Sequence, residues 1–192
     1  MSAEIPYLGF RCVLADPPWS FENWSAAGEA KNAKAKYPCE STDDIIKIAP
    51  KIGLDFRCAV ACGLELWATA PLMPDALRVM RGWGFGYVTA GAWAKRTKHG
   101  KPAFGTGYWL RSAAEFWLIG TRGAPSPKAR NVRNLIDAEV REHSRKPDDI
   151  YDVCEALFAG PYLELFARQA PRPGWVAWGN EVGKYAQEGV AA

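Results

Sequence analysis

The sequence has no apolar run long enough to span a membrane. None of its stretches approaches the roughly 20 consecutive apolar residues that a bilayer-crossing helix requires. Internal repeats, low-complexity tracts and a recognisable signal peptide are also absent. These absences argue against a membrane protein and a repeat array. A length of 192 residues favours a single domain over residues 1–192.

The cysteines lack the spacing of a redox or zinc motif, since none of them forms a Cys-x-x-Cys pair. They are Cys12, Cys39, Cys58, Cys62 and Cys154. An odd, scattered set without a signal peptide favours reduced thiols and a cytoplasmic location. A zinc site from Cys58 and Cys62 with His99 or His143 is conceivable, but structural zinc sites use other ligand spacings. We therefore predict no metal.

A glycine-rich dinucleotide fingerprint is also missing, because no Gly-x-Gly-x-x-Gly follows the first strand that we predict. A dinucleotide-dependent oxidoreductase is therefore disfavoured. What the chain does have is 48% hydrophobic residues, nine tryptophans and a formal net charge of +3. This composition supports a substantial core. The mild basicity is compatible with a nucleic-acid substrate without indicating one, and the tryptophans suit either a core or base-stacking surfaces.

The most informative stretch is the turn Asp16-Pro17-Pro18-Trp19, which follows a short apolar strand predicted at Phe10–Leu14. In open α/β sheets, ligands bind just beyond the carboxyl ends of strands. The two prolines have a fixed φ and no N–H, so they stiffen the turn. Asp16 offers carboxylate acceptors, and the Pro17 carbonyl is expected to be free to face a ligand. Trp19 offers a flat face on which a nucleobase could stack.

Together these groups could orient an exocyclic amino group. Its two hydrogens need two acceptors, which Asp16 and the Pro17 carbonyl would supply. The nitrogen lone pair would then point toward an electrophile, and no covalent intermediate is required. The alternative interpretation is a Pro-Pro strand terminator with Trp19 in the core, and the turn by itself does not decide between the two.

The rest of the chain alternates between predicted strands and helices. We expect strands at Phe10–Leu14, Leu64–Thr69, Tyr87–Lys95, Glu115–Gly123, Tyr162–Arg168 and Trp175–Trp178, and a short one within Val132–Glu142. We expect a helix that is capped by Ser41 or Thr42 and runs through Ile45 to about Lys51, and further helices from Pro71 to Trp83 and from Pro147 to Leu157. This order predicts an α/β fold with a parallel sheet and right-handed crossovers.

Two long stretches have no periodic pattern. One lies near residues 21–40 and contains Lys31, Lys34 and Lys36, and the other is a basic stretch near residues 96–108. In a nucleic-acid enzyme both would be substrate loops that contact phosphate. The alternative is that both are solvated surface loops whose charged side chains bind nothing.

Several stretches, in order along the chain, resemble the MT-A70 family of adenine-N6 methyltransferases. They are Asp16-Pro17-Pro18-Trp19; Tyr37 before a capped helix; Trp93-x-Lys95, a basic loop, Gly105-x-Gly107-Tyr108-Trp109 and a glutamate-bearing strand; His143-Ser144-x-Lys146-Pro147-Asp148; and Glu164-Leu165-Phe166-x-Arg168 with Gly179-Asn180-Glu181. The resemblance covers roughly Cys12 to Glu181. One departure is Ala167, which stands where some relatives have glycine and could narrow the approach of a cofactor.

The resemblance implies a Rossmann-like methyltransferase sheet in permuted order, with the catalytic strand N-terminal and the cofactor strand C-terminal. It also implies methyl transfer from S-adenosyl-L-methionine to the N6 amino group of adenine in DNA, because compact relatives look bacterial or phage-like. RNA is the alternative polymer, and a non-catalytic nucleic-acid-binding partner subunit with the same fold is the alternative role. With no recognition domain in the sequence, a homo-oligomer or a recognition partner is a further expectation.

The resemblance also implies roles for individual residues. The catalytic ones are Asp16, Pro17, Pro18 and Trp19. Those that bind the cofactor are Asp16, Lys146, Glu164, Leu165, Phe166, Arg168, Asn180 and Glu181. Those that bind the substrate are Trp19, Tyr37, Lys95, Arg96, Lys98 and Tyr108.

Overall fold

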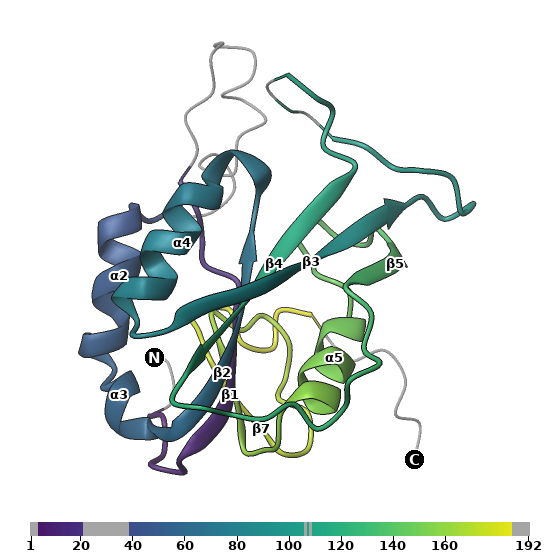
Figure 1. Cartoon of the computed structure of the whole chain (residues 1–192). Coiled ribbons are helices and arrows are strands. Elements are labelled where there is room, and N and C mark those ends of the chain that lie inside the picture. The colour runs from purple at the N-terminus through teal and green to yellow at the C-terminus, as the bar shows by residue number, and fades with distance from the viewer. Residues whose placement is uncertain (1–3, 21–38, 106, 108, 186–192) are drawn as a thin grey trace.

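The computed structural model describes residues 4–20, 39–105, 107 and 109–185 (Figure 1). Most of the substrate loop expected near residues 21–40, together with Tyr37 and Tyr108, lies outside the described residues. The elements are β1 (Phe10–Ala15), α2 (Thr42–Lys51), α3 (Leu54–Arg57), β2 (Cys58–Ala68), the short 3-10 helix η2 (Ala70–Leu72), α4 (Met73–Gly82), β3 (Gly86–Arg96), β4 (Ala114–Arg122), β5 (Leu135–Glu139), α5 (Asp149–Leu157), β6 (Tyr162–Leu165) and β7 (Trp175–Trp178). The predicted α/β class is confirmed.

The strands form a seven-stranded sheet in the order β5-β3-β4-β2-β1-β6-β7. β1 pairs in parallel with β2 and β6, β6 with β7, and β3 with β5. β4 runs antiparallel to both of its neighbours, so the expectation of a parallel sheet is wrong at this strand. The reason lies in residues 97–113, which contain no helix in their described part and do not carry the chain back across the sheet, as a parallel neighbour would require.

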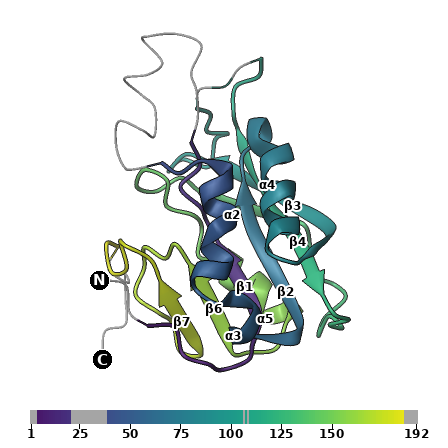
Figure 2. The ribbon, with the colours of Figure 1, turned by 90° about the vertical axis from the view of Figure 1, so that its left-hand side faces the viewer.

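Helices cover both faces of the sheet. Figure 1 shows α2, α3 and α4 on one side of the strands and α5 on the other, and Figure 2 shows the same layers from the side of α2 and α4. Two clusters of buried residues correspond to these faces. One joins β1 and β2 to α2 and α4, and the other joins Trp67, Trp93 and Trp117 to the apolar side of α5. A single sheet with both faces buried explains why β1 is apolar and buried from Cys12 to Ala15.

Local signals set the helix boundaries. Ser41 is the N-cap of α2 and accepts a hydrogen bond from the Asp44 backbone N–H at 3.2 Å, and Asp43 and Asp44 occupy the first turn. Of the two predicted caps, Ser41 and Thr42, the structure therefore has Ser41. The helix α5 begins at Asp149, just after the proline that we expected at its entry.

Two strands differ in length from the expectation. β2 begins at Cys58, six residues before the predicted start, and the short helix α3 before it was not predicted. β6 ends at Leu165, because Phe166 adopts a positive φ of 61° that turns the chain out of the sheet. Arg168, expected inside a strand, therefore lies in the turn beyond it.

None of the helices in the described part of the chain is long and apolar enough to cross a membrane. Across residues 4–20, 39–105, 107 and 109–185, no group of three or more His, Cys, Asp or Glu side chains is placed to hold a metal ion.

Candidate functional site

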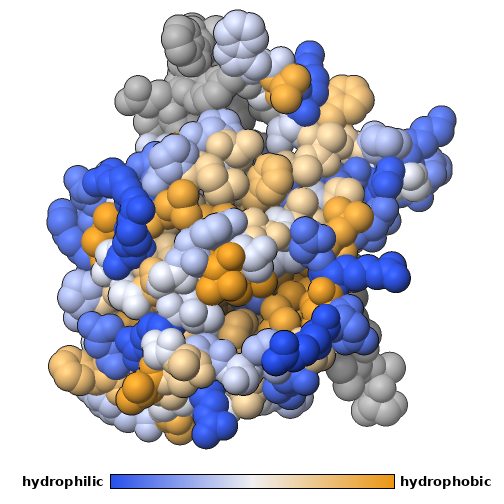
Figure 3. All heavy atoms as spheres, in the orientation of Figure 1, coloured by the Kyte–Doolittle hydropathy of each residue, from blue (hydrophilic) through white to orange (hydrophobic). Residues whose placement is uncertain are grey.

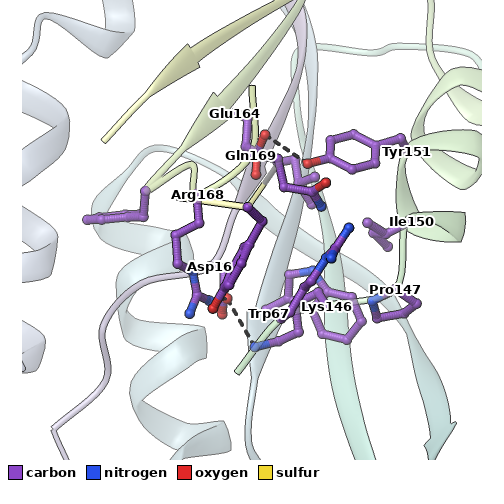
Figure 4. A pocket seen from close by; sticks show the side chains of 13 residues that line it. Asp16, Trp67, Lys146, Pro147, Ile150, Tyr151, Glu164, Arg168 and Gln169 are labelled. Carbon is purple, nitrogen blue, oxygen red and sulfur yellow. Dashed lines mark hydrogen bonds and ion pairs between the residues drawn. The ribbon is translucent and has the colours of Figure 1, made fainter. Parts of the chain in front are cut away.

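A cleft lies at the carboxyl ends of β1 and β6, against the N-terminal end of α5 (Figure 4). The space in it, including open solvent at its mouth, is about 380 Å³. The charged side chains that line it are Asp16, Arg145, Lys146, Glu164 and Arg168. The sheet topology brings them together from segments more than 120 residues apart in the sequence, since Lys146 and Asp16 are separated by 130 residues. The cleft is at the sheet edge where α/β proteins bind ligands.

Asp16 is the first residue after β1, and two cations hold its carboxylate. The Lys146 ammonium donates to Oδ2 at 3.0 Å, and the Arg168 guanidinium donates to the same oxygen. Both ion pairs that Asp16 forms with described residues use its Oδ2. Its Oδ1 is left to accept hydrogen bonds from a ligand. The turn after β6 is what brings Arg168 to this carboxylate.

Glu115 extends this network away from the cleft. Its carboxylate accepts from Lys95 at 2.5 Å and pairs with Lys146 at 3.3 Å. Burial alone would raise the pKa of Glu115, but the two ammonium groups hold it at about 2. Burial alone would lower the pKa of Lys146, but the carboxylates of Asp16 and Glu115 outweigh it and raise that pKa. Glu115 therefore stays ionised and fixes the position of Lys146.

Glu115 was not among the predicted site residues. It lies on β4, the strand that was expected to carry a glutamate. Because β4 runs antiparallel beside β3, Glu115 lies opposite Trp93 of β3 and close to Lys95 of that strand. The lack of helical periodicity in the sequence between residues 96 and 114 was the signal that could have suggested this pairing.

Glu164 lines the other side of the cleft from β6. Its carboxylate accepts from the Tyr151 hydroxyl of α5 at 2.9 Å (Figure 4). Burial raises the pKa of Glu164 to about 7, and the neighbouring Asp16 carboxylate adds to the rise. Burial also raises the pKa of Tyr151, so the phenol stays neutral and donates. The carboxyl group is consequently divided between its two protonation states near neutral pH.

Arg145 and Gln169 complete the polar lining, and neither was predicted. The buried Arg145 guanidinium pairs with Glu142 at 3.1 Å, and Gln169 donates to Asp148 at 2.7 Å. The ring of Tyr185 lies 5.4 Å from the Arg145 guanidinium. The contacts of Gln169 with Asp148 and of Arg145 with Tyr185 join separate segments, and such contacts leave no periodic or motif signal in the sequence.

The turn that follows Asp16 differs from the expectation in one respect. The Pro17 carbonyl accepts a hydrogen bond from the Trp19 N–H at 2.8 Å, so the expectation that it has no local partner is wrong. The reason is that the fixed φ of the prolines folds the chain tightly enough for residues 17 and 19 to bond. A carbonyl oxygen has two lone pairs, so one remains for a ligand.

Trp19 is a core residue in this structure. The residue is 5% exposed, and its indole N–H donates to the Trp67 carbonyl at 3.0 Å. This is the core alternative that the turn left open. Stacking of a base on Trp19 remains a prediction that requires part of the ring to become uncovered.

The remaining predicted residues divide into two groups. Phe166 lines the cleft, whereas Leu165 points into the core on the other face of the sheet. Asn180 and Glu181 lie in the turn after β7 and not in the lining, and Glu181 pairs with Lys184 at 2.5 Å. Their contact with a cofactor stays a prediction.

The predicted substrate residues on and beyond β3 are placed in different ways. Lys95 belongs to the ion-pair network, and Arg96 forms a two-point ion pair with Asp137, both contacts at 2.7 Å. Lys98 is exposed in the turn that follows. Of these three residues, Lys98 alone forms no ion pair with another described residue.

Comparison with known proteins identifies the family. The MT-A70 family model matches residues 10–181. The Type II methyltransferase M.MunI of Mycoplasma sp is 30% identical over 93% of this chain and 80% of its own length. The N(6)-adenosine-methyltransferase subunit METTL3 of Danio rerio is 30% identical over 93% of this chain, and the N(6)-adenosine-methyltransferase MT-A70-like of Arabidopsis thaliana is 30% identical over 95% of it.

The two longer relatives are matched over 29% and 25% of their own length, so the chain spans less than a third of each. The resemblance found in the motifs is thus confirmed by the match of the family model to most of the sequence. The acid-and-proline turn after β1 and the ion pairs around it lie within the matched residues, and the chain belongs to the MT-A70 family.

Proposed function

We propose that the chain transfers a methyl group from S-adenosyl-L-methionine to the N6 amino group of adenine in DNA. The observation that carries this proposal is the setting of Asp16. Its carboxylate stands at the carboxyl end of β1, on a proline-stiffened turn, with Lys146 and Arg168 on one oxygen and the other oxygen open to a ligand. This arrangement suits the orientation of an amino group.

The residues of the cleft fit the proposed cofactor. Three cations line the cleft against two carboxyl groups, one of which is partly protonated, so the lining favours a ligand that carries a carboxylate. Lys146 and Arg168 would hold that carboxylate, and Glu164 would accept from ribose hydroxyls. The backbone turn at Leu165 and Phe166 would lie beside the cofactor. Asn180 and Glu181 would contact it from the turn after β7, the strand next to β6. When bound, the cofactor supplies an electrophilic methyl group.

The chain itself orients the amine and receives its proton. Asp16 Oδ1 and the remaining lone pair of the Pro17 carbonyl accept the two amino hydrogens, which directs the nitrogen lone pair toward the methyl carbon. Methylation makes the nitrogen cationic, and the proton that it then loses can pass to Asp16. Lys146 and Arg168 hold the Asp16 carboxylate in place throughout, so little reorganisation of the site accompanies the reaction.

The permuted order of the sheet and the division into one domain are part of the proposal. The catalytic turn follows the first strand and the cofactor-binding turn follows β6, which pairs directly with β1. The loops near residues 21–40 and 96–108 would contact the nucleic acid, and a recognition partner or second copy would supply further specificity. We also propose a cytoplasmic location, from the cysteine content.

DNA is proposed over RNA because the chain resembles the Type II methyltransferase over 80% of that protein's length, and the N(6)-adenosine-methyltransferases over less than a third of theirs. RNA remains the alternative polymer, and the experiment below separates the two.

The test is methyl transfer from labelled S-adenosyl-L-methionine to single-stranded DNA, duplex DNA and RNA, followed by mass analysis of the nucleosides. The variant is Asp16→Asn, and the matched control is Asp43→Asn, which removes an exposed carboxylate on α2. We expect N6-methyladenine in DNA from the wild type and the control, and a loss of at least about 100-fold in Asp16→Asn.

Two outcomes would contradict the proposal. Methylation of RNA in preference to DNA would assign the alternative polymer. Tight binding of nucleic acid with neither cofactor binding nor transfer would assign the non-catalytic role.

A further inference from the structure

The connection between β3 and β4 carries the most exposed aromatic residue of the described chain. Trp109 is 99% exposed and the adjacent Leu110 is 83% exposed. We refer to these two residues as the apolar tip. Large apolar side chains that project singly into water are ordinary, but two adjacent ones at the end of a projection suggest a binding function.

The projection is held by backbone hydrogen bonds along its two sides. Ala103 donates to the Lys95 carbonyl at 2.9 Å, and Gly105 donates to the Ser112 carbonyl at 2.9 Å. A Cβ on Gly107 would lie 1.9 Å from the Leu110 carbonyl oxygen, so the chain passes itself closely here. The apolar tip is therefore presented by a supported arm.

The arm has the charge of a nucleic-acid contact. Residues 97–114 contain Lys98, Lys101 and Arg111 and no aspartate or glutamate. None of the three forms an ion pair with another described residue, so their charges remain available to a polyanion. Figure 3 shows strongly hydrophilic and apolar residues side by side on the upper right of the molecule, where this arm projects. Cations beside an exposed ring match a phosphate backbone beside a base stack.

The arm also begins and ends at the proposed active site. Lys95 precedes it and Glu115 follows it, and this pair joins Lys146 and Asp16 through successive ion pairs. Figure 1 shows the β3–β4 connection leaving the sheet at the same end as the catalytic turn after β1. A nucleic acid whose adenine enters the cleft therefore meets the arm.

We propose that the apolar tip inserts into duplex DNA and fills the position from which the target adenine is extruded. This inference rests on the proposed function, since an adenine within a duplex must leave the base stack before its amino group can reach Asp16. An apolar wedge placed between base steps is a known way to separate them. Trp109 would replace the lost stacking on the neighbouring bases, and Lys98, Lys101 and Arg111 would contact the flanking phosphates.

The test compares two forms of one DNA duplex that contains the adenine most methylated by the wild type in a random-sequence pool. In the first form the adenine is paired with thymine, and in the second it faces an abasic site and is already unpaired. The variants are Trp109→Ala and the rescue variant Trp109→Phe. The matched control is Phe56→Ala, which truncates an exposed aromatic residue on α3, at the opposite end of the sheet.

We expect the single-turnover rate of Trp109→Ala to fall about 30-fold or more on the paired duplex and less than about 3-fold on the abasic duplex. Trp109→Phe should recover most of the loss, because a phenyl ring also stacks. Phe56→Ala should leave both rates unchanged. A selective loss of this kind would not follow from a general weakening of the fold.

Three results would overturn the inference. An equal loss on both duplexes would assign Trp109 a structural or phosphate-binding role. No loss on either would show that the ring does not contact the substrate. A dimer in sedimentation that Trp109→Ala dissociates would assign the apolar tip to a second copy of the chain. If the wild type methylates neither duplex while binding the cofactor, the proposed function itself fails, which is a distinguishable result.

Discussion

The buried carboxyl group of Glu65 should make the stability of this protein fall as pH rises. Glu65 lies in the middle of β2, fully buried, and neither of its carboxyl oxygens has a hydrogen-bond partner among the described residues. Burial raises its pKa from an ordinary value of 4.5 to about 8. The folded protein therefore keeps this group neutral at pH 7, where the unfolded chain ionises it.

The size and sign of the effect follow from this difference in pKa. Each pKa unit corresponds to about 1.4 kcal/mol, so ionisation in the unfolded state alone reduces the free energy of unfolding by about 3 kcal/mol at pH 7 and about 5 kcal/mol above pH 8. The stability is fully present below pH 4.5 and is lost as pH rises toward 8. Replacement by glutamine, which never ionises, removes this dependence.

The measurement is urea unfolding of the wild type and Glu65→Gln at several pH values between 5 and 8.5. We expect the difference in the free energy of unfolding to grow by about 1.4 kcal/mol per pH unit up to pH 8. The buried amide of Glu65→Gln can shift the free energy of unfolding by the same amount at every pH, and such a shift does not change how the difference grows with pH. The exposed Glu139 on β5 gives the control Glu139→Gln, for which no growing difference is expected. Parallel curves for wild type and Glu65→Gln would show that the carboxyl is hydrated or paired and would refute the argument.

Three further predictions follow from other contacts. The pKa of about 7 at Glu164 predicts that cofactor affinity falls several-fold from pH 8 to pH 6, as measured by calorimetry, and that Glu164→Gln binds weakly with no such pH dependence. The pKa of about 2 at Glu115 predicts that Glu115→Gln costs about 3 kcal/mol at pH 7, a difference that disappears as pH falls from 4.5 to 2 in unfolding experiments. A Cβ on Gly91 would lie 2.1 Å from the buried Trp117 ring, so Gly91→Ala should lower the free energy of unfolding by about 1–3 kcal/mol, as measured by thermal unfolding. A Cβ on Gly86 would come no closer than 3.7 Å to its nearest neighbour, so the control Gly86→Ala should lower it less.

The parts of the fold that the sequence predicted are those with a local signal. The apolar run of β1 ends at two prolines, and Ser41 with the acids after it starts α2, so each boundary is encoded by adjacent residues. The pairing of β4 is not encoded in this way. It depends on where the chain returns after residues 97–113, which only the absence of a helix in that stretch indicated.

The candidate site shows the same division between local and distant signals. Asp16, Lys146 and Arg168 were found because each lies in a motif, and the structure joins them in one ion-pair cluster. Glu115 was not found, because its partners Lys95 and Lys146 are brought near it by the sheet. Arg145 was not found, although its ion-pair partners Glu142 and Asp148 are close to it in the sequence. A charge network can therefore be predicted only as far as its members belong to motifs.

The two tryptophans Trp19 and Trp109 show why an aromatic residue needs a position before it can be given a role. Trp19 belongs to the catalytic motif, yet its indole is satisfied by the carbonyl of Trp67, 48 residues away on β2, and its ring is packed in the core. This burial anchors the turn that holds Asp16. Trp109 lies in a loop with no such partner strand and projects into water. Because a base can stack only on an uncovered face, the structure favours positioning as the contribution of Trp19 and leaves stacking to the residue on the arm.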